Sequence, residues 1–157
     1  MVLFFQVIIG LILALIVYNL IHYLFVSRPT RKRLKMGQKV VDQAVNGVLP
    51  ELVTKVDILP IRSQEIAKVW GRGVMAFEYE IAKDKTNLSA DEFRQQLTTS
   101  LDEYGKHHHF ESSAVKNDQS VFRLTDVWEL EDKLHFDVAF MVNQTTIEYV
   151  EDLDRLT

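Results

Sequence analysis

The sequence predicts an α+β protein in which one N-terminal transmembrane helix precedes a small domain with a mixed or antiparallel sheet and helices packed on one face. Three observations predict it. Residues 2–26 form 25 consecutive positions without a formal charge. Further along, apolar residues alternate in some stretches, as in strands, and recur every three or four positions in others, as in helices. The chain has no Cys, which excludes a disulfide scaffold and thiolate zinc sites.

The uncharged run has the length of a membrane-spanning helix. At about 1.5 Å per residue it would extend roughly 37 Å, more than the roughly 30 Å hydrocarbon core of a bilayer. No Lys or Arg precedes the run and no Ala-x-Ala cleavage site follows it, so it does not fit a cleavable signal peptide. We therefore expect residues 2–26 to anchor the chain in a lipid bilayer.

A basic juxtamembrane segment, residues 27–39, follows the anchor. It has no acidic residue and six basic ones: Arg28, Arg31, Lys32, Arg33, Lys35 and Lys39. The positive-inside rule then predicts the N-terminus outside the cell membrane and the C-terminal domain in the cytoplasm. Each of these side chains should also attract anionic lipid headgroups by about 1 kcal/mol.

The predicted membrane helix carries one stripe that is smaller and more polar than its surroundings. Its members recur every four residues: Gln6, Gly10, Ala14, Tyr18 and His22. Small residues at this spacing let two helices approach closely, which predicts a homo-oligomer or a membrane partner. In the alternative interpretation the aromatic and polar residues merely occupy the interfacial belts of the bilayer.

The soluble domain, residues 40–157, is acidic. The chain has 18 basic and 22 acidic residues, and removing the six basic residues of the juxtamembrane segment leaves 12 against 22. This charge repels phosphate backbones, so we expect no nucleic acid partner.

Two longer helices are predicted in this domain, in addition to a short one at the C-terminal end of the chain. From Thr30, apolar residues share one face (Leu34, Val41, Ala44, Val45, Val48 and Leu49), and Pro29 favours a break before them. This helix could pack on its own sheet, lie on the membrane or form a coiled-coil stalk. The second helix should begin at a capping box, Ser89 to Glu92, and end at Gly105.

The strand predictions follow alternation. Residues 51–61 suggest a strand, although Pro50 could equally start a helical turn, and residues 63–68 suggest a single helical turn. From residue 75 to 82 the apolar side chains alternate with Glu78 and Glu80. The chain should close with a second capping box, Thr145 to Glu148, and a short acidic surface helix.

A hairpin is predicted between the helix that ends at Gly105 and the short helix that closes the chain. Trp128 and Leu130 should share the buried face with Phe136 and Leu134, which requires a three-residue loop, residues 131–133. In this register Asp126 lies opposite Val138, and Asp126 and Asp137 lie on opposite faces. The register therefore argues against these two carboxylates acting together.

Candidate chemistry is sparse. Three His and a carboxylate lie close in sequence and are the weak metal-ligand candidates: His107, His108, His109 and Glu111. Successive residues diverge on a helix and alternate on a strand, so a site would need further ligands from elsewhere. No nucleophile elbow, zincin, kinase or dinucleotide motif is present. We therefore predict no cofactor and no catalytic residue.

In layout alone, a membrane helix followed by a small α+β domain, the chain resembles the VirB8-like proteins of type IV secretion, which have a cystatin-like domain. That resemblance implies an extracytoplasmic envelope subunit, but its basic residues precede the helix, whereas here they follow it. We expect instead a membrane-anchored scaffold that binds other proteins. A ligand sensor or an enzyme with a site assembled from distant residues is the alternative.

Overall fold

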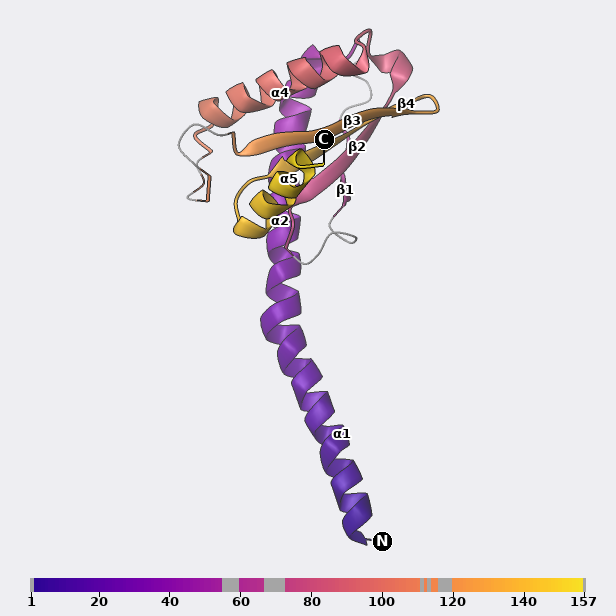
Figure 1. Ribbon diagram of the computed structural model, residues 1–157, viewed down its shortest axis with the longest axis vertical. Coiled ribbons are helices and arrows are strands. Elements are labelled where there is room, and N and C mark those ends of the chain that lie inside the picture. The colour runs from indigo at the N-terminus through magenta and orange to yellow at the C-terminus, as the bar shows by residue number, and fades with distance from the viewer. Residues whose placement is uncertain are drawn as a thin grey trace. The chain divides into compact units, whose positions relative to one another are not determined.

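The computed structural model describes residues 2–54, 60–66, 73–110, 112, 114–115 and 120–156. The chain divides into two compact units, residues 1–35 and 36–157. The second unit confirms the predicted α+β class, with helices and a four-stranded antiparallel sheet (Figure 1).

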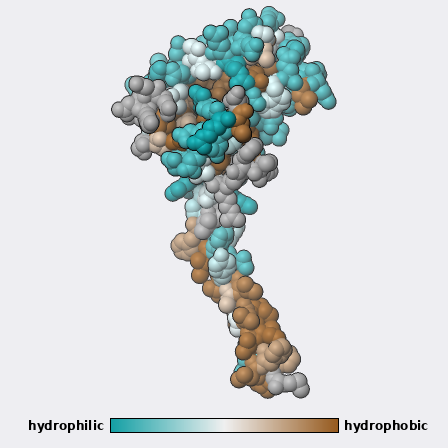
Figure 2. All heavy atoms as spheres, in the orientation of Figure 1, coloured by the Kyte–Doolittle hydropathy of each residue, from teal (hydrophilic) through white to brown (hydrophobic). Residues whose placement is uncertain are grey.

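Helix α1, Val2–His22, has no buried residue. Figure 2 shows its surface as a continuous run of hydrophobic side chains. By length and composition it is a helix that could cross a membrane. An apolar helix without a buried side chain matches hydrocarbon better than water.

The predicted break near Pro29 is a change of helix type rather than a helix end. A π-helical segment, Tyr23–Ser27, leads directly into α2, Arg28–Val48, and the Arg28 N–H donates to the carbonyl of Tyr23. Pro29 has no N–H for the carbonyl four residues earlier, and its ring crowds that carbonyl. A wider π turn just before the proline accommodates this local defect.

The C-terminal half of α2 is the first helix of the domain. Its buried residues include the predicted Val41, Ala44, Val45 and Val48. The helix packs on the sheet, since the hydroxyl of Tyr79 donates to Asp42 Oδ1 at 2.8 Å. This confirms the interpretation of α2 as a helix packed on its own sheet.

The sheet contains β1 (Gln64–Glu65), β2 (Ala76–Ala82), β3 (Phe122–Leu130) and β4 (Lys133–Phe140), in the order β1-β2-β4-β3. A short 3₁₀ helix, η4 (Lys83–Lys85), follows β2.

The strand predicted at 51–61 is wrong where the structure describes it. Leu49–Glu51 form a 3₁₀ turn, η2, and residues 52–54, 60 and 61 are not in strands. Residues 55–59 lie outside the described residues. Pro50 therefore begins a helical turn, the other possibility that its fixed φ favours.

The helical turn predicted at 63–68 is also wrong, because Gln64 and Glu65 form β1. Asp42 Oδ1 accepts hydrogen bonds from the backbone N–H and the hydroxyl of Ser63, and this pair of contacts holds the approach to β1 against α2. Residues 67 and 68 lie outside the described residues.

The hairpin has a different register from the predicted one. Leu130 pairs with Lys133 and Trp128 with His135, so the loop has two residues, and Glu131 adopts a positive φ of 55°. The register shifts between Leu124 and Asp126, which leaves Thr125 as a β-bulge. One inserted residue turns every side chain beyond it to the other face. Trp128 and Leu130 therefore leave the buried face.

The two sheet faces are unlike. The inner face, covered by α2 and α4, is apolar: Phe77, Tyr79, Ile81, Leu134, Phe136 and Val138 are all buried. The outer face is covered at one end by α5, Gln144–Asp154, whose Tyr149 and Val150 join Ala76 and Ala139 in one buried cluster. Figure 1 shows α4 and α5 on opposite sides of the sheet.

Helix α4, Ala90–His107, begins at the predicted capping box of Ser89 and Glu92. Gly105 is not its C-cap, because it lies inside the helix, where a Cβ would be 3.5 Å from the ring of Phe122. The cap uses His109 instead, which has a φ of 53°. Its N–H donates to Lys106 O, and the N–H of Phe110 donates to Gly105 O.

The sequence suggested that Thr145 caps α5 and that α5 is a solvated surface helix. Both predictions are wrong, because Asn143 is the N-cap and Thr146, Tyr149 and Val150 are buried. The side-chain oxygen of Asn143 accepts from the N–H of Thr146 at 2.8 Å. The hydroxyl of the buried Thr146 in turn accepts from the N–H of Met75. This bond ties the first turn of α5 to the start of β2.

Candidate functional site

Three adjacent strands place carboxylates side by side on the outer face. Glu78 on β2 is the Cα partner of Asp137 on β4, and Asp137 is the Cα partner of Asp126 on β3. We call these three residues the carboxylate rung. The sequence analysis placed Asp126 and Asp137 on opposite faces, and the bulge at Thr125 is the reason that this prediction is wrong.

Asp137, at the centre of the rung, has the largest pKa shift among the carboxyl groups that the structure describes. Its Oδ1 is buried, and none of the residues that the structure describes donates a hydrogen bond to it. Burial raises the pKa of Asp137 from 3.8 to about 7, with help from the negative charges of Glu78 and Asp126. Burial raises the pKa of Tyr149 as well, and the charges of Asp137 and Asp126 add to it. Near neutral pH, Asp137 can therefore hold or release a proton.

Glu78 is also paired with the buried imidazole of His135, which lies on β4 as Asp137 does. Its Oε1 lies 3.0 Å from Nδ1 of His135, whose side chain is only 10% exposed, against 37% for Glu78. The indole of Trp128 stacks on the His135 ring, with centroids 5.2 Å apart and 16° between the planes. Trp128 and His135 therefore present an aromatic surface beside the carboxylate of Glu78.

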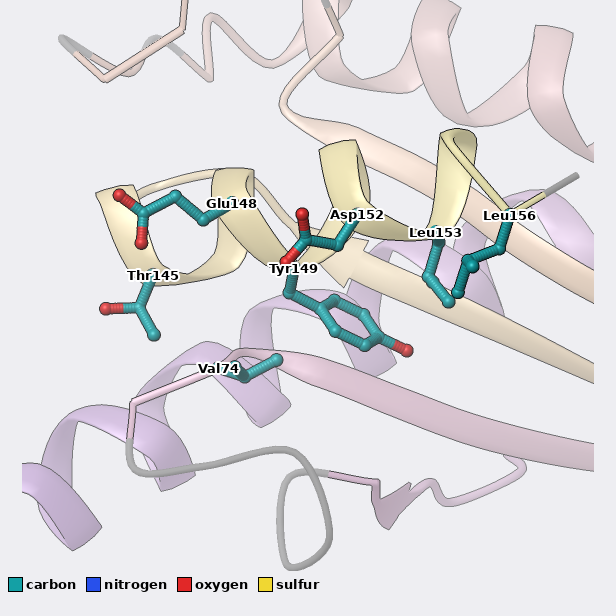
Figure 3. Close-up of a pocket in the computed structure, with 7 residues that line it drawn as sticks. All are labelled: Val74, Thr145, Glu148, Tyr149, Asp152, Leu153 and Leu156. Atoms are coloured by element: carbon teal, nitrogen blue, oxygen red, sulfur yellow. The ribbon is translucent and has the colours of Figure 1, made fainter.

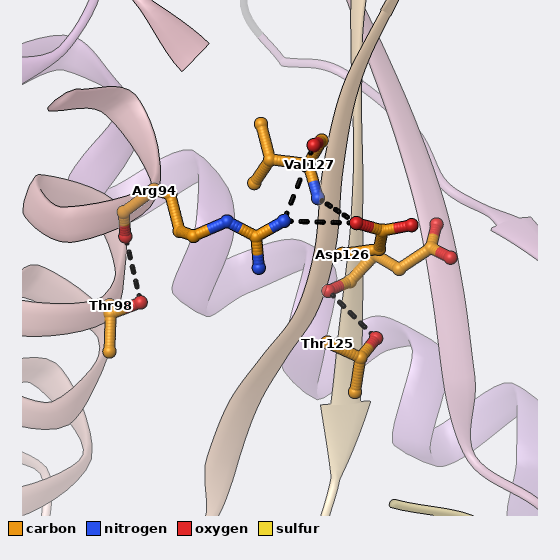
Figure 4. A network of polar contacts seen from close by, with 6 residues as sticks. Arg94, Thr98, Thr125, Asp126 and Val127 are labelled. Carbon is orange, nitrogen blue, oxygen red and sulfur yellow. Dashed lines mark hydrogen bonds and ion pairs between the residues drawn. The ribbon is translucent and has the colours of Figure 1, made fainter. Parts of the chain in front are cut away.

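Asp126 lies on β3, the last strand in the sheet order, and Arg94 reaches its carboxylate from α4 (Figure 4). Its Oδ1 accepts from Arg94 Nη2 at 2.9 Å and from the N–H of Val127 at 2.8 Å, and Arg94 also donates to the carbonyl of Val127 at 3.3 Å. These contacts occupy the backbone N–H and carbonyl of Val127, with which another strand could otherwise pair. The ion pair itself is well exposed, so its contribution to stability is small.

The structure describes the three histidines of the candidate metal cluster but not its carboxylate. His107, His108 and His109 are exposed at the end of α4, and Glu111 lies outside the described residues. Within the described residues, no three His, Asp or Glu side chains could hold a metal ion together. The positive φ of His109 gives this segment a structural role as a helix cap.

The predicted membrane-contact residues lie in or next to the apolar helix. Gln6, Gly10, Ala14 and Tyr18 are exposed on α1, and the ring of Tyr18 stacks on His22 at 6.1 Å. All six basic side chains of residues 27–39 are exposed, and the guanidinium of Arg28 lies 5.6 Å from the ring centre of Tyr23. Membrane-surface contact and helix association stay predictions for these residues.

Comparison with protein-family profiles, with curated proteins and with solved structures gives no match. The function must therefore be argued from the residues themselves. Sequence reasoning missed the carboxylate rung, because it placed Asp126 and Asp137 on opposite faces and did not connect Glu78 with them. Their alignment across three strands depends on the bulge, for which Thr125 gives no signal in the sequence.

Proposed function

We propose that this protein is a membrane-anchored interaction module: α1 holds the acidic domain at the cytoplasmic side of the cell membrane, where it binds and positions other proteins. The observation that carries the proposal is α1 itself, an apolar helix of 21 residues without a buried side chain. A helix of this kind is stable in lipid, and its cost in water would be large.

The six basic side chains of the juxtamembrane segment support the proposed cytoplasmic location of the domain. All six lie between residues 28 and 39, whereas the residues before them carry no charged side chain. Basic residues beside a span are retained in the cytoplasm and attract anionic headgroups. Salt would weaken the headgroup attraction, since these side chains are exposed.

The outer face supports protein binding. Glu78 and Asp126 remain 37% and 59% exposed, and Trp128 is half-buried beside them. Aromatic side chains are enriched where proteins bind one another. The negative charge of the face favours partner surfaces rich in Lys and Arg.

Cysteine labelling tests the orientation, because the chain has no Cys of its own. We expect Val2→Cys to react with a membrane-impermeant maleimide in intact cells, and Asp91→Cys, exposed on α4, to react only after lysis. Labelling of Asp91→Cys in intact cells would place the domain outside and would overturn the cytoplasmic assignment.

Site-specific photo-crosslinking tests the binding role. A benzophenone amino acid at position 128 should yield a discrete protein adduct in membranes, whereas the same group at Glu103, exposed on α4, should not. The adduct should disappear in the Glu78→Gln background. Equal adducts from both positions, or no adduct from either, would count against the outer face as the binding surface.

A further inference from the structure

A pocket of about 210 Å³ lies against α5 (Figure 3). Val74, Leu153, Leu156 and the ring of Tyr149 line it with apolar surface, and Glu148 and Asp152 line it with carboxylates. Drug-sized ligands occupy cavities of about 300–1,000 Å³. This pocket is smaller, so its volume suits a single long side chain.

The spacing along α5 explains the mixed lining. Residues 148, 149, 152 and 153 recur at helical intervals, which places them along one side of α5, and Leu156 lies in the turn that follows the helix. Leu153 and Leu156 lie at the C-terminal end of this row and Val74 lies beneath it, whereas Glu148, Tyr149 and Asp152 come from the turns before (Figure 3). One elongated molecule could therefore meet apolar and acidic groups at the same time.

Negative charge predominates around the pocket, and Arg155 and Arg123 are cations that pair with carboxylates at the end of α5. Gln144–Asp154 contains four carboxylates and no Lys or Arg. Asp152 pairs with Arg155 at 3.0 Å, but both side chains are 71% exposed, so this pair costs little to exchange. Glu148 accepts only from the neutral amide of Gln144, at 3.1 Å, among its described contacts. A cation from outside would complement this surface.

We propose that the pocket receives an arginine side chain of a partner protein. The aliphatic stem of the arginine lies against Val74, Leu153 and Leu156, and its guanidinium meets Glu148 and Asp152. Arginine fits this lining because it combines an apolar stem with a planar cation that pairs with carboxylates and stacks on an aromatic ring such as that of Tyr149. The inference rests on the proposed interaction function and gives the partner its chemistry.

The test uses N-butylguanidinium as the probe and the 157-residue chain in nanodiscs with labelled Leu and Val methyl groups. We expect saturable shifts of the Val74, Leu153 and Leu156 methyl signals, with a dissociation constant in the millimolar range that a fragment of about eight non-hydrogen atoms allows. Pentanoate, which has a similar stem and the opposite charge, should cause none.

The double variant Glu148→Gln, Asp152→Gln should weaken probe binding about tenfold or more, since it removes both charges. Glu151→Gln, on the same helix but outside the pocket lining, is the matched control and should bind as the parent does. Amide spectra that superimpose on those of the parent would establish that both variants are folded.

Three results would overturn the proposal. The first is no saturable shift up to about 50 mM probe, a concentration that covers weak fragment binding. The others are undiminished probe binding in the double variant and equally tight binding of N-butylammonium. The probe reports on the pocket without any partner protein. Its failure is therefore distinguishable from a failure of the crosslinking experiment at position 128.

Discussion

Asp137→Asn should stabilise the domain at neutral and alkaline pH. In the folded state burial and two neighbouring carboxylates raise the pKa of Asp137 from 3.8 to about 7. Folding therefore favours the protonated form, so this residue's contribution to stability is complete below about pH 4 and is lost as the pH rises to about 7. Asn is neutral throughout and should remove this loss.

The size of the effect follows from the pKa difference. A change from 3.8 to about 7 corresponds to about 4 kcal/mol for a shielded carboxyl group, at about 1.4 kcal/mol per pH unit. Asp137 is only half-buried, and water screens part of the repulsion from Glu78 and Asp126. We therefore expect the variant to gain about 2 kcal/mol at pH 8 and almost nothing at pH 4.

Urea unfolding of the 157-residue chain in detergent micelles, followed by tryptophan fluorescence between pH 4 and pH 8, measures this gain. Asp84→Asn, an exposed carboxylate outside the rung, is the control and should follow the parent at every pH. If the difference between Asp137→Asn and the parent does not change with pH, Asp137 is ionised in the folded protein and the reasoning fails.

The same unfolding assay checks three further predictions. Asp42→Ala should cost about 2–3 kcal/mol, because the buried Tyr79 hydroxyl and Ser63 lose their acceptor, whereas Tyr79→Phe should cost about 1 kcal/mol; equal costs would contradict this account. Gly105→Ala should stabilise α4 by about 0.5–1 kcal/mol, since its Cβ would make an ordinary 3.5 Å contact. Gly47→Ala, the matched change in α2, should gain less, because its Cβ would lie 2.9 Å from a Tyr104 ring carbon. His109→Gly should gain about 0.5–1 kcal/mol by relieving a positive φ, and a loss would refute the strain.

The elements that sequence reasoning predicted correctly depend on local spacing. The apolar α1, the alternation along β2 and the capping box at Ser89 each involve residues within a few positions of one another. Local patterns of this kind need no knowledge of the tertiary fold. The same is true of the buried stripe of α2, which packs as its helical period predicts.

The elements that it predicted wrongly depend on contacts between distant segments. Gly105 resembles a helix end, yet the helix continues to His107 and Phe122 packs close to Gly105. The bulge at Thr125 is one residue in length, but it reverses the faces of Trp128 and Leu130. The carboxylate rung could not be predicted for the same reason, because its alignment requires the correct register of β2, β3 and β4.

The rung also explains why α5 covers only one end of the outer face. Next to the helix, Ala76 and Ala139 are small and apolar, so Tyr149 and Val150 can pack on them and exclude water. One step along the strands, Glu78 and Asp137 replace those alanines. A helix extended over them would bury two carboxylates, only one of which has a described partner, at a cost that apolar packing would not offset. The acidic side chains therefore keep this part of the sheet open, and the surface that we propose for partner binding follows from the same residues that limit the helix.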